Sequence, residues 1–182
     1  TGAAKKESIA NLQLRMPIVV VGGGLTAVDT ATESLAYYAR QVEKFAARHA
    51  VLVAERGEEA VRSGWSEEDR EVAAEFLAHG QAIADERARA AAEGRAPRLR
   101  GLLESWGGAT IAYRRRLADA PSYTLNHEEV AKAMEEGVRF AEGLSPVEVV
   151  ADRFGHAAAL RLLRKGVAGD EVVELPASTV LG

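Results

Sequence analysis

Cysteine is absent from this chain of 182 residues. Because thiolate sulfur is the required ligand or reactant, its absence excludes disulfides, a redox-active dithiol, iron–sulfur ligation and cysteine-based zinc sites. The other candidate metal ligands are four histidines, which are scattered over separate parts of the sequence. We therefore expect no metal site, and we assign surface or capping roles to His49, His79, His127 and His156.

Long apolar runs and a strong net charge are also missing. No stretch of about 18 apolar residues exists, so we expect no membrane-spanning helix. The net charge of −4 provides no electrostatic case for binding nucleic acid or an anionic membrane. Residues 1–6 lack the apolar segment of a signal peptide, so we expect a cytoplasmic location by default. Since the chain does not begin with Met, we expect it to be a piece of a larger protein.

The most informative stretch is a β-branched run followed at once by three glycines. Ile18 to Val21 is typical of a parallel strand buried on both faces. Gly22, Gly24 and Ala27 then fit the dinucleotide-binding pattern G-x-G-x-x-G/A at the start of a helical segment.

Each small residue of this pattern has a physical role in our interpretation. Gly22 adopts backbone angles that other residues avoid, Gly24 lets a diphosphate approach the main chain, and Ala27 lets the helix lie close to the strand. The helix start then offers unpaired N–H groups to the phosphates. The alternative is a tight strand-to-helix turn in some other α/β domain.

Periodicity and turn residues predict the remaining elements. Ser66 and Asp69 form the pattern of a capping box at a helix start, and Asn126 is expected to start a later helix. The predicted helices cover residues 25–57, 66–92, 97–106 and 126–136. The predicted strands after the first cover residues 109–113, 138–141, 147–151, 157–163, 172–175 and 176–181.

This order predicts an α/β fold of the Rossmann type with a helical insertion. Parallel strands would carry helices on one face and an antiparallel meander on the other. The link between the first helix and the second strand is far longer than the usual 2–6 residues, so it reads as an insertion. We therefore predict the first half of a dinucleotide-binding domain at residues 1–39, a helical insertion at 40–106 and the second half at 107–182.

Three arginines follow the predicted second strand. In dinucleotide-binding units this strand end meets the adenosine ribose, where a carboxylate selects NAD and an arginine pairs with the 2′-phosphate of NADP. No acidic residue appears before Asp119, which favours a 2′-phosphate site made by Arg114 and Arg115. Arg116 is a weaker candidate that is also compatible with a position facing solvent. The alternative for all three is a solvated basic loop.

The motifs together resemble the NADPH-binding domain of the glutamate synthase small-subunit type of flavoprotein. That family belongs to the FAD-dependent pyridine nucleotide-disulfide oxidoreductase-like enzymes, which have two dinucleotide-binding domains. The resemblance is carried by the glycine turn and by residues 108–115, 128–140, 145–149 and 175–181. The helical insertion is not part of the family pattern.

The resemblance implies a hydride donor site in an NAD(P)H-dependent flavin oxidoreductase. NADPH would bind to this domain, and FAD would be held by an FAD-binding domain of the same parent chain, so the isolated piece is expected to be inactive. Asp29 would lie near the nicotinamide, or would instead complement the helix dipole from the first turn. Hydride transfer requires no acid or base, so we name no catalytic residue. The residues implied to line the diphosphate are Gly22, Gly23, Gly24, Leu25, Thr26 and Ala27.

Two other functions are compatible with the sequence. The chain could be a nucleotide-free structural module that uses the helical insertion to bind a partner or a second copy. It could also be an NAD-linked enzyme domain whose arginines contact something other than a 2′-phosphate.

Overall fold

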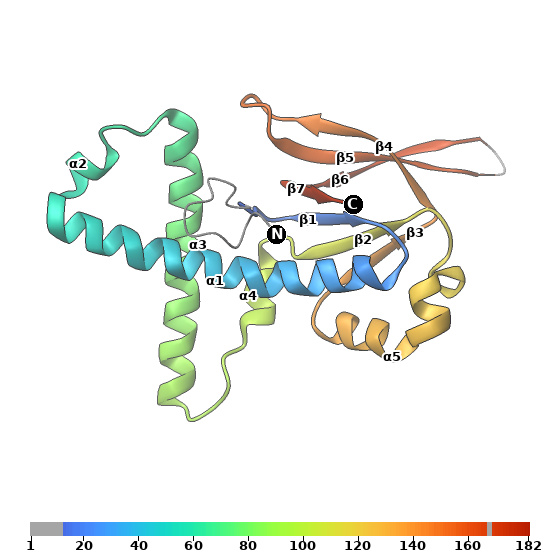
Figure 1. Ribbon diagram of the computed structural model, residues 1–182, viewed down its shortest axis with the longest axis horizontal. Helices are drawn as coiled ribbons and strands as arrows, with labels where there is room; N and C mark the ends of the chain where they lie inside the picture. Colours follow the sequence, from blue (N-terminus) through green and yellow to red (C-terminus); the bar gives the residue numbers. More distant parts are fainter. Residues whose placement is uncertain (1–12, 167–168) are drawn as a thin grey trace.

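The computed structural model describes residues 13–166 and 169–182 (Figure 1). A helical turn expected over residues 8–14 lies largely outside the described residues. The helices and strands, in chain order, are β1 (Ile18–Val21), α1 (Leu25–Arg56), α2 (Glu58–Arg62), α3 (Glu67–Ala92), α4 (Leu99–Ser105), β2 (Ala109–Tyr113), the 3-10 helix η1 (Leu117–Asp119), α5 (Pro121–Glu135), β3 (Arg139–Glu142), β4 (Leu144–Ala151), β5 (Ala157–Arg164), β6 (Glu171–Pro176) and β7 (Thr179–Leu181).

The strands form two separate sheets. The first is a 4-stranded sheet with the order β3-β2-β1-β7, and all of its neighbouring strands are parallel. The second is a 3-stranded antiparallel sheet with the order β4-β5-β6, which is the predicted meander. In Figure 1 the meander lies on one side of the parallel sheet, and helices α1 and α5 lie on the other. The predicted α/β, Rossmann-like fold class is confirmed.

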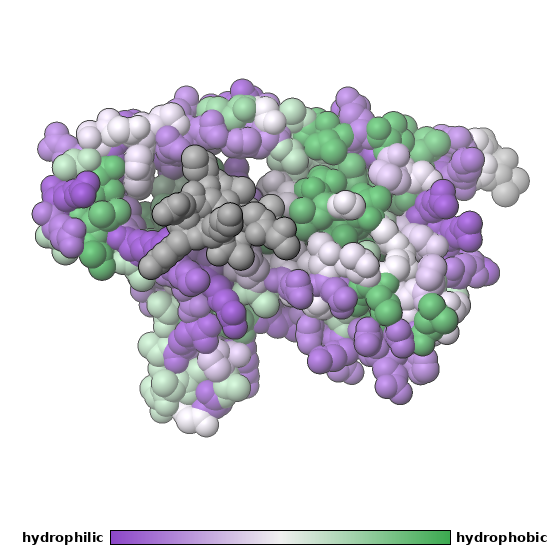
Figure 2. Space-filling model, viewed as in Figure 1, coloured by the Kyte–Doolittle hydropathy of each residue, from purple (hydrophilic) through white to green (hydrophobic). Residues whose placement is uncertain are grey.

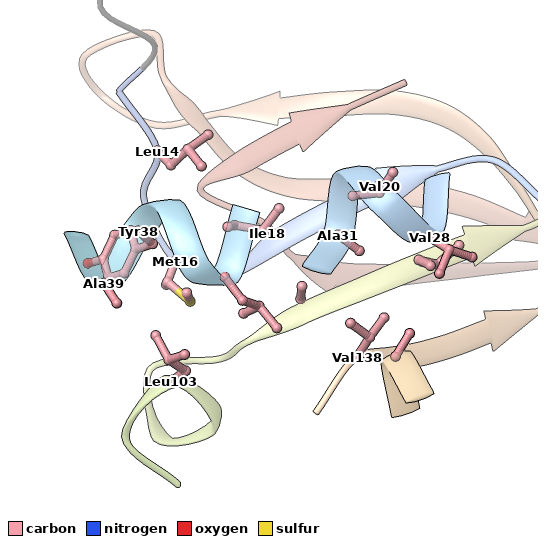
Figure 3. Packing of buried hydrophobic residues seen from close by; sticks show 14 of the residues in the cluster. Leu14, Met16, Ile18, Val20, Val28, Ala31, Tyr38, Ala39, Leu103 and Val138 are labelled. Carbon is pink, nitrogen blue, oxygen red and sulfur yellow. The ribbon is translucent and has the colours of Figure 1, made fainter. Parts of the chain in front are cut away.

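Strand β1 is buried on both faces, as its unbroken β-branched run predicts. Ile18 and Val20 belong to the core between the parallel sheet and helix α1, where they meet Val28 and Ala31 (Figure 3). Val19 belongs to a second core, between the parallel sheet and the meander. Burial of each such side chain stabilises the fold by about 1.5–3 kcal/mol, so both layers depend on this strand.

The two predicted helix starts have different outcomes. The capping box at α3 is confirmed, because the Ser66 hydroxyl accepts from the Asp69 N–H at 3.0 Å and the Asp69 carboxylate accepts from the Ser66 N–H at 3.0 Å. The predicted start at Asn126 is confirmed in part, because α5 consists of two helical pieces that meet at Asn126, and the unpredicted first piece begins at Pro121. Asn126 is a non-helical residue within this segment (φ −147°, ψ 61°), so it marks a kink.

Helix α1 continues without interruption into residues 40–106, the segment predicted to be an insertion and called so below. Its 32 residues are buried only as far as Val42, and beyond this point the helix extends away from the sheet (Figure 1). Helix α3 crosses α1 at Gly80, where a Cβ atom would lie 2.7 Å from the Val42 carbonyl oxygen and 2.9 Å from the Ala46 Cβ. The absence of a side chain at Gly80 therefore permits the close approach of the two helices.

A half-buried polar cluster lies where the insertion meets the sheet. The Tyr38 hydroxyl lies 2.6 Å from Nδ1 of His79 and 3.5 Å from Oε1 of Glu75. The imidazole of His79 stacks on Trp106 with ring centroids 3.8 Å apart. Burial raises the pKa of Tyr38, so the phenol keeps its proton, and burial lowers the pKa of His79. The Glu75 carboxylate is paired with Arg15 at 2.5 Å.

The insertion is also tied to the meander. The turn between β4 and β5 carries Arg153, which forms ion pairs with Glu67, at 3.0 Å, and with Glu71 on helix α3. In the same turn, Nε2 of His156 lies 2.8 Å from the Glu68 carboxylate. Such exposed pairs each contribute little stability, but together they orient α3 against the meander.

Two kinds of feature are absent from residues 13–166 and 169–182. None of the helices in these ranges is both long enough and apolar enough to cross a membrane. No group of three or more histidine, aspartate or glutamate side chains in these ranges is arranged to hold a metal ion.

We predict that Gly80→Ala destabilises the protein by about 1–3 kcal/mol, because the new methyl group overlaps the α1 backbone. The matched control is Gly101→Ala in α4, where a Cβ meets nothing within 4 Å. That change should be neutral or stabilising, by up to about 1 kcal/mol. Urea denaturation of both variants checks the prediction, and equal effects would contradict the role given to Gly80.

We predict that stability falls as the pH drops below about 6.5, because the pKa of His79 is lowered from its usual 6.5 by burial. In this range the unfolded chain binds a proton that folded His79 does not, so acid favours unfolding. His79→Gln should flatten the dependence of Tm on pH between about 7.5 and 5. The control is His127→Gln on the exposed surface of α5, which should keep the dependence of the unmodified chain.

Candidate functional site

The glycine turn lies at the carboxyl edge of the parallel sheet, at its topological switch point. From β1 the chain continues to β2 and β3 on one side of the sheet, and it later returns to β7 on the other side of β1. Ligands of open α/β sheets bind in the crevice that such a reversal leaves outside the carboxyl ends of the strands. Residues 22–24 follow β1 directly and therefore occupy this position.

The conformational role predicted for Gly22 is wrong, because none of the three turn glycines has a positive φ. A Cβ atom at Gly22 would instead lie 3.0 Å from the Cβ of Ala27, so close packing of helix on strand requires the small residues. Gly24 is the N-cap of α1, with φ −93° and ψ 172°. A Cβ at Gly24 would meet nothing within 4 Å, so this residue is open to an approaching group.

The start of helix α1 presents unpaired N–H groups. The Gly24 carbonyl accepts from the N–H groups of Ala27, at 3.1 Å, and Val28, at 3.4 Å. Within the described part of the chain, the backbone N–H groups of residues 23–26 donate no hydrogen bond. The first turn of α1 contains no acidic residue. The helix dipole and these donors together make an anion-binding end.

Two residues that the sequence analysis did not assign to the site, Tyr113 and Ser122, contact Gly23. The ring of Tyr113 lies directly on it, and a Cβ at Gly23 would come within 2.5 Å of the ring atoms Cδ2 and Cζ. The Gly23 carbonyl accepts from the N–H of Ser122, at 3.2 Å, and from its hydroxyl, at 3.0 Å. The open side of the turn is therefore at Gly24.

The predicted arginines follow the end of β2, next to the glycine turn. The register pairs Val21 of β1 with Ala112 of β2, so Arg114 and Arg115 leave the same edge of the sheet one strand away. Both side chains are exposed, and neither forms an ion pair with a residue of the described ranges.

Arg116 differs from its two neighbours because it has a partner. The Nε of Arg116 lies 3.0 Å from Oδ2 of Asp119, and its Nη2 lies 3.2 Å from Oδ1 of the same carboxylate. This bidentate pair lowers the pKa of Asp119. The ion pair stabilises the loop after β2 and occupies the Arg116 side chain.

Hydrogen bonds with Glu142, the last residue of β3, and with the following Gly143 close this loop. The Glu142 carboxylate accepts from the Leu117 N–H at 2.7 Å, and the Arg115 carbonyl accepts from the Gly143 N–H at 3.0 Å. Glu142 is far from the arginines in sequence, so no local pattern pointed to it. These bonds hold the peptide groups on either side of Arg116 while Arg114 and Arg115 stay exposed.

Asp29 lies beyond the first turn of α1, so the first-turn alternative for this residue is wrong. It is exposed and lines a cavity of about 450 Å³ between α1 and α5, together with Thr32, Glu129 and Lys132. Leu25 at the helix start also lines this cavity, which places the cavity beside the anion-binding end.

Comparison with known proteins identifies a sequence relative. No family model matches the chain. The chain is 39% identical over 155 residues to Uncharacterized protein RP006 of Rickettsia prowazekii (strain Madrid E), and the alignment covers 85% of the chain and 19% of that protein. The chain thus spans about a fifth of the length of this relative.

Among solved structures, the chain aligns with the Bacillithiol Disulfide Reductase Bdr (YpdA) from Bacillus cereus. The identity is 13% and the TM-score is 0.36, over 93% of this chain and 28% of the other.

We predict that Gly23→Ala costs about 1–3 kcal/mol of stability, because the added methyl group displaces the Tyr113 ring. Gly24→Ala should cost about 1 kcal/mol at most, because a Cβ there meets nothing within 4 Å but alanine is a poorer helix N-cap than glycine. In a Tyr113→Ala background, Gly23→Ala should lose most of its effect. A double-mutant cycle measured by urea denaturation tests this coupling, and additive effects would contradict the ring contact.

Proposed function

We propose that this chain is the NADPH-binding domain of an FAD-dependent oxidoreductase. In this proposal the dinucleotide-binding halves are residues 1–39 and 107–182, and residues 40–106 are a helical insertion. The flavin is held by an FAD-binding domain elsewhere in the same parent chain. The motif resemblance to the glutamate synthase small-subunit type of flavoprotein supports this choice of class.

The observation that carries the proposal is the pairing of two anion-binding features at one edge of the sheet. The unpaired N–H groups of residues 23–26 suit the diphosphate of a dinucleotide. The side chains of Arg114 and Arg115, one strand away, are exposed and form no ion pair within the described ranges, so they suit an additional phosphate on the ribose. NAD lacks that phosphate, so NADP(H) is the better match.

The residues of this chain bind and orient the coenzyme. The small residues Gly22 and Ala27 set the position of the helix start, and Gly24 leaves room for the diphosphate. Arg114 and Arg115 hold the 2′-phosphate, and it is the family resemblance that assigns Asp29 to the nicotinamide end. NADPH, when bound, supplies a hydride from nicotinamide C4 to N5 of the flavin, which requires no acid or base from this domain.

We predict that the chain binds NADPH more tightly than NADH. Arg114→Glu combined with Arg115→Glu should remove this preference, because each hydrogen bond to a charged group contributes about 1.5–3 kcal/mol. Affinity for NADH should change much less. Isothermal titration calorimetry with both coenzymes, on both proteins, measures the difference.

The matched control combines Arg70→Glu with Arg40→Glu, which also reverses two charges, at exposed positions on helices α3 and α1. It should leave the preference for NADPH unchanged. Equal affinities for NADPH and NADH in the unmodified chain, or no binding of either, would contradict the proposal.

A second candidate function is a nucleotide-free interaction module that uses the insertion. The observation that favours it is a groove of about 390 Å³ at the far end of α1, lined by apolar side chains and by three basic ones: Phe45, Leu52, Ala60, Val61, Trp65, Arg48, His49 and Arg56. Leu52 and its neighbour Val51 are exposed, and Figure 2 shows hydrophobic residues at this end of the molecule, on the left. This function requires a glycine turn that binds no coenzyme, so the same titration separates the two candidates.

A further inference from the structure

Ser122 is the least exposed polar residue near the glycine turn. It lies in the first turn of α5 and is 1% exposed. Its N–H and its hydroxyl both donate to one acceptor, the carbonyl of Gly23, at 3.2 Å and 3.0 Å. Two donors from one buried residue therefore hold a single peptide group of the turn.

This contact determines the direction of the next N–H group. In a trans peptide the C=O and N–H bonds point in opposite directions. Because the Gly23 carbonyl points at Ser122, the N–H of Gly24 points away from α5. The Gly24 side is also the open side of the turn, since no heavy atom lies within 4 Å of a Cβ built there. The Tyr113 ring packs against Gly23 in the direction in which a Cβ atom would project.

We propose that Ser122 is a positioning residue for coenzyme binding, which acts by directing the Gly24 N–H toward the diphosphate. This inference rests on the proposed function and extends it to a residue outside both binding motifs. Ser122 acts through the peptide between Gly23 and Gly24, whereas Arg114 and Arg115 act on the 2′-phosphate. Loss of the Ser122 hydroxyl therefore weakens the binding of every ligand that carries the diphosphate. The binding of a ligand that lacks the diphosphate is unchanged.

The test compares three ligands on the unmodified chain and on Ser122→Ala. NADPH and NADH both carry the diphosphate, and 2′-AMP carries only the adenosine and the 2′-phosphate. Ser122→Ala should weaken NADPH and NADH by the same factor, about three- to tenfold. Binding of 2′-AMP, followed by NMR titration, should not change. A merely structural loss would weaken all three ligands together.

Two further variants and one spectrum complete the experiment. Ser34→Ala is the matched control, since Ser34 is also a buried serine whose hydroxyl donates to a backbone carbonyl, that of Thr30 at 2.6 Å. It should leave all three affinities unchanged. Ser122→Cys is nearly isosteric and keeps a weak donor. It should weaken the binding of NADPH and NADH, but not that of 2′-AMP, by a smaller factor than Ser122→Ala. This variant also provides the test if the alanine variant folds poorly. The amide NMR signal of Gly24 in the free protein should shift in both Ser122 variants.

The outcomes separate the inference from the proposed function. If the unmodified chain binds neither NADPH nor NADH, the proposed function fails and this inference falls with it. If the unmodified chain binds NADPH but the Ser122 variants bind it equally well, only the inference is overturned. Parallel loss of 2′-AMP and NADPH binding in both Ser122 variants also overturns it.

Discussion

Helix α1 can begin directly beside the end of strand β1 only because both contact residues are small. A Cβ atom at Gly22 would lie 3.0 Å from the Cβ of Ala27, so larger side chains would push the helix start away from the strand. This one close approach decides where the first N–H groups of α1 emerge. It brings their partial positive charge to the edge of the sheet from which Arg114 and Arg115 also leave.

The same helix connects the candidate site with the insertion. Helix α1 runs unbroken from Leu25 to Arg56, so the orientation of its start also sets the direction of its far end. At the other end of the insertion, Trp106 stacks on His79 and leads through two glycines into β2. The insertion is therefore connected to the site at both ends, through helix α1 at one end and through the stacked Trp106 at the other.

The site itself divides into features that are local in sequence and features that are not. The strand, the glycine turn and the following helix lie within one short stretch, so their pattern predicted the turn and its exposed donors. The reason given for Gly22 was nevertheless wrong, because a local pattern cannot distinguish a need for unusual backbone angles from a need for space. The start assigned to the helix at Asn126 was right only for the second helical piece of α5, since no local pattern predicted the first piece, which begins at Pro121.

The amino-acid sequence by itself determined the order of the elements, the capping box at Ser66 and the burial of β1 on both faces. Each of these depends on residues within a few positions of one another, whose preferences act before the chain is folded. Only the tertiary structure decided which distant groups support the turn. Ser122 reaches Gly23 across 99 positions of sequence, and Glu142 closes the arginine loop from another strand. Such partners meet only after the sheet has assembled, because a hydrogen bond depends on position in space and not on spacing along the chain.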